Sequence, residues 1–133
     1  MKRFALFALG GLLLAQTPAV HNVYILPMAN GLDQYLAERI TEDHVMVVVA
    51  NAKSADAVLT DRLGPGFEQQ MDDLDGKKKD EASHVFHSVA GRGTIFLVDA
   101  HSRKVLWSDY EKPGGNVTRD AERIVKKLQS FGK

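Results

Sequence analysis

The pattern of hydrophobic and polar residues in the first half of the chain predicts a strand, a helix and a second strand. "NVYILPM" at residues 22–28 and "VMVVVAN" at residues 45–51 are nearly continuous apolar runs, which is typical of strands buried on both faces. Between them, apolar side chains recur at helical spacing: Leu32, Tyr35, Leu36 and Ile40. A unit of this kind is expected to be parallel and right-handed.

A third strand and a second helix follow. In "SADAVLTDRLG", residues 54–64, one set of alternating positions is apolar, which predicts a strand with one wetter face. The set Ala55, Ala57 and Leu59 alternates with Asp56, Val58 and Thr60. Glycine and proline at residues 64–66 end this strand. Apolar side chains at positions i, i+4 and i+7 then predict a short amphipathic helix: Phe67, Met71 and Leu74.

The end of the chain predicts a hairpin and a last helix. "TIFLV" at residues 94–98 and "VLWSDY" at residues 105–110 are rich in branched and aromatic residues, and a short polar turn joins them. Strict alternation would place Val105, Trp107 and Asp109 on one face of the second strand. The opposite face then carries a mixed set, so we expect the hairpin near a sheet edge: Leu106, Ser108 and Tyr110. The last helix has an apolar stripe, with Thr118 as its expected N-cap: Ala121, Ile124, Val125, Leu128 and Phe131.

The element order is therefore β-α-β-β-α-β-β-α, and a mixed sheet covered by helices is its natural packing. We predict an α/β (α+β) fold with a two-layer mixed sheet of about five strands and two to three helices, formed as a single domain by residues 20–133. Residues 76–92 carry mixed charge and few large apolar side chains, so a flexible loop is expected there. The expected core comprises Ile25, Leu26, Leu36, Ile40, Val47, Val48, Phe96, Val98, Ile124 and Leu128.

The first 19 residues have a different character from the rest. Lys2 and Arg3 precede a 12-residue apolar run, and Thr17 and Ala19 form a small-residue cleavage site, as in a secretory signal peptide. The run is shorter than the ~20 residues that a membrane span needs. Cleavage after Ala19 leaves 15 basic and 17 acidic residues, and this net charge of −2 favours neither nucleic acid nor an anionic membrane as partner. We therefore expect a soluble periplasmic or secreted protein with no membrane span after cleavage.

Two groups of residues are candidates for chemistry. Asp99, His101 and Ser102 are the residue types of a hydrolase, but neighbouring turn residues point apart and are ordinary turn formers, so we interpret them as a turn. His84 and His87 form an H-x-x-H pair close to two acidic residues, and a surface metal site is the alternative to solvated loop histidines. There is no cysteine, so the chain carries neither a disulfide nor a lipid-anchoring cysteine, and no cofactor-binding motif is present.

Two stretches resemble a known group of proteins. "ADAVLTDRLG" and "IFLVDAHSRKVLWS" are similar to a strand and a hairpin of bacterial envelope accessory domains, and "VYILPMANGLDQYLAERI" resembles their first strand and helix. That group contains the curli-pore lipoprotein, the lipoprotein activators of penicillin-binding proteins and the N-terminal domain of the Tol-system β-propeller protein. The matching positions are Ala55, Asp56, Leu59, Leu97, Asp99, Val105 and Trp107. The chain departs from the pattern at Ser102-Arg103, which replaces the usual turn glycine, and in having no lipidation cysteine.

The resemblance implies a two-layer α/β domain that acts through protein contacts and brings no catalytic residue, metal ligand or cofactor. We therefore expect a small exported, non-enzymatic accessory domain that binds another envelope protein. Trp107 and Tyr110 are the candidate partner-binding residues, because a large aromatic at a sheet edge suits an added strand. The alternative is a hydrolase or a metal-binding protein that uses the loop histidines and acids.

Overall fold

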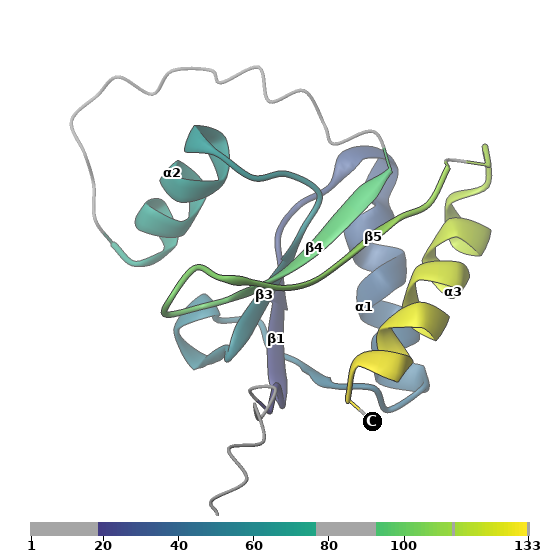
Figure 1. Ribbon diagram of the computed structural model, residues 1–133, viewed down its shortest axis with the longest axis horizontal. Helices are drawn as coiled ribbons and strands as arrows, with labels where there is room; N and C mark the ends of the chain where they lie inside the picture. The colour runs from purple at the N-terminus through teal and green to yellow at the C-terminus, as the bar shows by residue number, and fades with distance from the viewer. Residues whose placement is uncertain (1–18, 77–92, 113, 133) are drawn as a thin grey trace, which may run out of the picture.

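A computed structural model of the chain describes residues 19–76, 93–112 and 114–132. Within them five strands form one mixed sheet in the order β2-β1-β3-β4-β5, and three α-helices pack on it (Figure 1). The α+β class, the mixed sheet and the predicted order of elements are confirmed. Residues 1–18 of the expected signal peptide and residues 77–92 of the expected flexible loop lie outside the described residues.

The first three strands form the parallel part of the sheet. β1 (Asn22–Ile25) pairs in parallel with β2 (Val47–Val48) on one side and with β3 (Ala57–Thr60) on the other. α1 (Leu32–Glu42) connects β1 to β2, as predicted for the first βαβ unit. β4 (Thr94–Asp99) runs antiparallel to β3 and pairs with β5 (Val105–Tyr110) in the predicted hairpin.

The main hydrophobic core lies between one face of the sheet and two helices. α1 and α3 (Val117–Leu128) lie side by side over this face, and each contributes the apolar stripe that its sequence predicts (Figure 1). The buried side chains of this core are Val23, Met28, Leu36, Ile40, Ala57, Leu59, Ile95, Leu97, Ala121, Ile124, Val125 and Leu128.

A smaller core lies on the opposite face, beneath α2 (Pro65–Leu74). Phe67 and Met71, from the predicted amphipathic stripe, are both 2% exposed and pack there with Leu26, Val58 and Val98. β3 is consequently buried at all four of its positions. The prediction of a wetter face for this strand is therefore wrong, because the stripe that covers that face comes from a helix later in the chain.

The second strand also differs from its prediction. The apolar run at residues 45–51 yields only the two residues of β2, which lies at an edge of the sheet with Val47 61% exposed. Val47 is therefore not a core residue, whereas Ile25, Val48 and Phe96 are partly buried against the two cores. The other six predicted core residues are buried, but Leu26 and Val98 belong to the smaller core.

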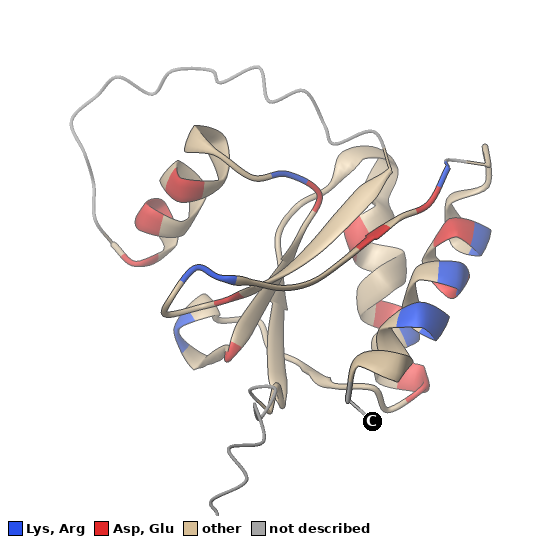
Figure 2. Cartoon of the chain, viewed as in Figure 1, with Lys and Arg blue, Asp and Glu red and all other residues tan. Residues whose placement is uncertain are grey.

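α3 is held at its start and along its length by polar contacts. Its N-cap is Asn116, whose side-chain oxygen accepts the Arg119 N–H at 3.2 Å, so the prediction of Thr118 as N-cap is wrong. Charged residues follow the whole length of this helix (Figure 2). One of them, Lys127, reaches the sheet: its Nζ lies 3.3 Å from Asp109 Oδ2 and 2.9 Å from Glu111 Oε1. These ion pairs join the last helix to β5 and the residue that follows it.

Candidate functional site

The polar residues between β4 and β5 form a turn that is organised by Asp99. Oδ1 of Asp99 accepts the backbone N–H groups of Ser102 at 2.8 Å and of His101 at 2.9 Å, as in an Asx turn. These bonds, led by that from Ser102, hold the pKa of the Asp99 carboxyl below its ordinary value, against the opposing effect of its burial. The Ser102 hydroxyl oxygen in turn accepts the Lys104 N–H at 3.3 Å.

This geometry serves the turn and does not assemble a catalytic triad. In a triad the carboxylate orients the imidazole side chain, and the imidazole contacts the nucleophile. Asp99 instead binds the backbone of His101, and the side chains of His101 and Ser102 are exposed. The arrangement is therefore the one expected of a hairpin turn.

The metal-site alternative rests on residues that the structure does not describe. His84 and His87 lie within 77–92, together with the neighbouring acids Asp80 and Glu81. Within the described ranges, no group of three or more histidine, aspartate or glutamate side chains is placed to hold a metal ion. Among the same residues, no helix is long and apolar enough to cross a membrane.

β5 is the outer strand of the hairpin, and its free edge is the longer of the two edges of the sheet. The Glu111 N–H donates to the Gly93 carbonyl at 2.9 Å. From this residue back along β5, the backbone N–H groups point alternately toward β4 and away from it. In an antiparallel pair every second residue bonds to the partner strand, so the backbone N–H groups of Ser108 and Tyr110 point away from β4. No strand in the described part of the chain pairs with them. The expectation that the hairpin lies at a sheet edge is confirmed.

The two candidate partner-binding residues of β5 have different surroundings. Tyr110 is 61% exposed at the end of the strand, whereas Trp107 is partly buried against the main core. A register shift between Leu97 and Val98 places Leu106 as an extra residue opposite them, so Leu106 and Trp107 both contact the main core. The strict alternation predicted for residues 105–110 is therefore wrong at this bulge, and Tyr110 is the aromatic side chain that β5 presents to solvent.

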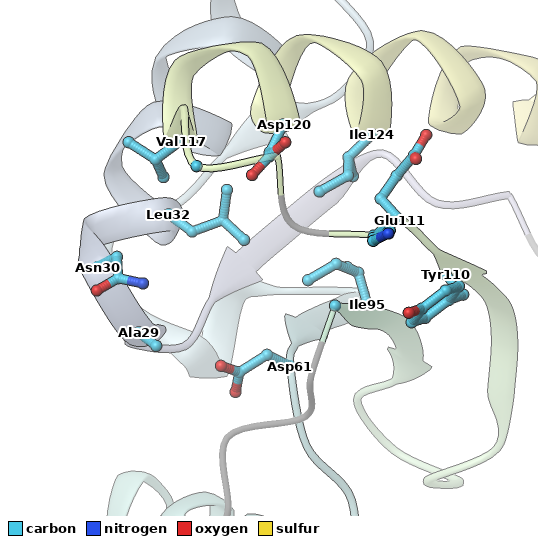
Figure 3. A pocket seen from close by; sticks show the side chains of 13 residues that line it. Ala29, Asn30, Leu32, Asp61, Ile95, Tyr110, Glu111, Val117, Asp120 and Ile124 are labelled. Atoms are coloured by element: carbon cyan, nitrogen blue, oxygen red, sulfur yellow. The ribbon is translucent and has the colours of Figure 1, made fainter.

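A cavity of about 760 Å³ opens at the end of the sheet where β1 and β3 finish and β4 begins (Figure 3). Apolar side chains from α1, β4 and α3 form much of its wall: Leu32, Ile95, Val117 and Ile124. Ile95 and Ile124 are also members of the main core, so the cavity is an opening onto that core. Tyr110 stands at the rim, at the end of β5.

Three carboxylates line the same cavity. Asp61, directly after β3, is only 4% exposed, and its Oδ1 accepts Arg62 Nε at 2.8 Å. Glu111 is paired with Lys127, and Asp120 in the first turn of α3 lies 2.9 Å from the Arg123 guanidinium. A buried carboxylate at the end of a central strand, beside apolar walls, is the arrangement of a small-molecule site more than of a packed core.

Apart from Tyr110 at the rim, which was a candidate for partner binding, sequence reasoning did not single out the cavity residues as a site. Asp61 carried a usable signal, because a charged residue directly after a short apolar strand lies at the carboxyl edge of the sheet, where ligands bind in open α/β sheets. Nothing in the sequence marked Leu32, Ile95 and Ile124 as cavity residues, because apolar side chains that line a cavity follow the same spacing as those that fill a core.

Comparisons with known proteins found no match. No protein-family model matches the chain, and neither the curated proteins nor the solved structures contain one that does. The resemblance to envelope accessory domains stays a prediction that depends on short stretches around β1 and α1, β3 and the β4–β5 hairpin.

Proposed function

We propose that this protein is an exported, non-enzymatic accessory domain that binds another envelope protein through the free edge of β5. The observation that carries the proposal is the edge itself: a six-residue strand with outward N–H groups at Ser108 and Tyr110. An extended segment of a partner can add to such an edge, since main-chain hydrogen bonds supply affinity and exposed side chains supply selectivity.

The side chains of β5 support this use of the edge. Soluble proteins commonly protect an outer strand with a proline, an inward-pointing charge or a covering segment. Asp109 of β5 is a charge directed toward α3 and paired with Lys127, but Ser108 beside it is exposed and small, and Val105 and Tyr110 are 45% and 61% exposed. The opposite edge of the sheet is less suitable, because β2 has only two residues to offer.

Export is the second part of the proposal, and its support comes from the sequence. The charged start, the short apolar run and the small residues before Val20 have the order of a secretory signal. The partner is then a protein of the same envelope compartment. The hydrolase alternative uses the loop histidines and acids, which lie outside the described residues, whereas the Asp99 carboxylate of the turn binds backbone N–H groups.

Photo-crosslinking in intact cells tests the proposed interface. A photoreactive phenylalanine derivative is placed at Tyr110 and, in a matched control, at Tyr35, which is 39% exposed on α1. We expect ultraviolet light to link an envelope protein to the first position and not to the second, with the product identified by mass spectrometry. An identical product from both positions, or none from position 110, would contradict the proposal.

Two substitutions separate binding from folding. Tyr110→Ala should reduce the yield of that partner in a pull-down with an unchanged melting temperature, because its side chain is mostly in water. Trp107→Ala should lower the melting temperature, because its side chain packs against the main core. A stability loss from Tyr110→Ala that equals the loss from Trp107→Ala would show that β5 does not present the two residues in these ways.

A further inference from the structure

We propose that the cavity at the end of the sheet binds a small molecule composed of an aliphatic chain and a primary ammonium group. The ammonium would lie against the Asp61 carboxylate, and the chain would lie along the walls formed by Leu32, Ile95 and Ile124. This site meets the free edge of β5 at Tyr110 on its rim, but the inference is argued from Asp61 and the apolar walls and does not depend on the proposed partner binding.

The size and the walls of the cavity favour a small molecule with an apolar body. Its volume of about 760 Å³ lies within the range of roughly 300–1,000 Å³ that is usual for small-molecule sites. Three of its wall residues, Leu32, Ile95 and Ile124, are aliphatic and partly or fully buried. An aliphatic chain that displaces water from such side chains lowers the free energy, because apolar surface is removed from water.

The charges around the cavity favour a cationic head group. Asp61, Glu111 and Asp120 line the cavity, whereas Lys112 is the one ammonium among the described lining residues. The basic groups that pair with the three carboxylates do not line it: Arg62, Lys127 and Arg123. Asp61 is the buried carboxylate that a ligand inside the cavity would meet, whereas the Glu111 carboxylate is directed away from the cavity and pairs with Lys127.

The starts of α1 and α3 also border the cavity, and a helix start by itself favours an anion. Here each first turn already contains a carboxylate. Asp120 accepts the Gly114 N–H at 3.3 Å, and Asp33 accepts the Met28 N–H at 3.1 Å. These carboxylates offset the positive helix ends, so the buried Asp61, whose Oδ1 pairs with Arg62, is the group by which the cavity favours a cation over an anion.

The test compares three probes of equal chain length: n-hexylammonium, 1-hexanol and hexanoate. Each is titrated into the purified protein while two-dimensional NMR spectra record backbone signals. We expect n-hexylammonium to bind about tenfold more tightly than 1-hexanol, because a charge-assisted bond to Asp61 adds to the apolar contact. The shifted signals should include Gly93, Gly115 and Val117 at the cavity. Hexanoate should bind more weakly than both.

Two variants assign the binding to this cavity. Asp61→Asn should weaken n-hexylammonium binding about tenfold and leave 1-hexanol binding nearly unchanged. If that variant unfolds, Val117→Phe provides the test, since it fills the cavity without changing the charge and should abolish binding of every probe. Val47→Phe is the control, because residue 47 is 61% exposed on β2 and does not line the cavity.

Several results would overturn the inference. Hexanoate binding as tightly as n-hexylammonium would show that the helix starts outweigh the carboxylates. Binding of Nα-acetyl-lysine amide without binding of n-hexylammonium would show that the site takes a side chain of a protein. Absence of any shift at millimolar n-hexylammonium would show that the cavity binds no such amine, and it would leave the proposed use of the β5 edge untouched.

Discussion

The carboxylate of Asp99 lies across the β4–β5 turn from the backbone of Ser102, and its Oδ1 accepts the Ser102 N–H at 2.8 Å. The same oxygen accepts the His101 N–H. A hydrolase would need such a carboxylate to orient a histidine side chain. In this protein the Asp99 carboxylate binds the main chain instead. The turn that it stabilises fixes where β5 begins, and with it the position of the free edge.

The Asp99 bonds give folding stability an acid dependence. Because the folded-state pKa of Asp99 lies below its ordinary value, the carboxylate contributes stability at neutral pH that is lost as the pH falls below about 4. Asp99→Asn removes this titration and keeps an oxygen that accepts the same N–H groups. Urea unfolding should show the variant less stable than wild type at pH 7, with the difference shrinking at pH 2.5. A difference that stays constant between the two pH values would contradict this account.

Arg103 occupies a position of the same turn that favours glycine. Its φ of 63° lies in the left-handed region, where a side chain adds steric cost, and its guanidinium lies 3.4 Å from Asp75 and 5.9 Å from the centre of the Phe67 ring. Arg103→Gly loses those contacts and relieves the backbone, whereas Arg103→Ala loses the same contacts and keeps the strain. Chemical denaturation should find the alanine variant about 1 kcal/mol less stable than the glycine variant. Equal stability of the two would show that the turn has no such preference.

Leu128 and Val47 provide a matched test of the core. Leu128 is fully buried between α3 and the sheet, and Val47 is 61% exposed on β2. Leu128→Ala should cost about 2–5 kcal/mol of unfolding free energy, and Val47→Ala less than about 0.5 kcal/mol. Denaturant titration of the two variants measures both values. A loss at residue 47 as large as that at residue 128 would contradict the edge position of β2.

Substitutions at Lys127 and at Lys126 distinguish the stabilising effect of an ion pair from that of a surface charge. The bond to Glu111, followed by that to Asp109, raises the pKa of Lys127, so its contribution is present at neutral pH and is lost as the pH rises above the ordinary lysine value of 10.5. Lys127→Met should lower the melting temperature more than Lys126→Met, because Lys126 has no ion pair among the described residues. The difference should shrink in 1 M salt. A salt-independent difference would indicate packing of the Lys127 stem as its source.

Local patterns predicted most of this fold. The helical spacing of Leu36 and Ile40 and of Ile124 and Leu128 placed α1 and α3 against the sheet, where all four side chains are buried. Element order then predicted the parallel βαβ unit and the hairpin. These features succeed because each depends on residues close together in the sequence or on a general rule of chain connection.

The failures have one cause in common: they depend on contacts between distant segments. Alternation predicted Val58 on a half-exposed face, but Phe67 of α2 covers it. The apolar run predicted Val47 in the core, but its strand lies at an edge of the sheet. The bulge at Leu106 could not be read from alternation, because one extra residue in β5 depends on its pairing with β4. The cavity around Asp61 is of the same kind, since its lining comes from five separate stretches of the chain.

The central claim, that a partner strand adds to β5, is tested most directly at Ser108. Its N–H points away from β4, so Ser108→Pro removes a donor that a partner strand would use while the bonds of β5 to β4 remain. The partner identified by crosslinking is titrated against wild type and this variant, with thermal melting of both. We predict that the variant binds the partner at least tenfold more weakly, because about one main-chain hydrogen bond is lost and the partner strand is displaced. The melting temperature should be nearly unchanged. Equal affinity of the two proteins for the partner would contradict strand addition at this edge.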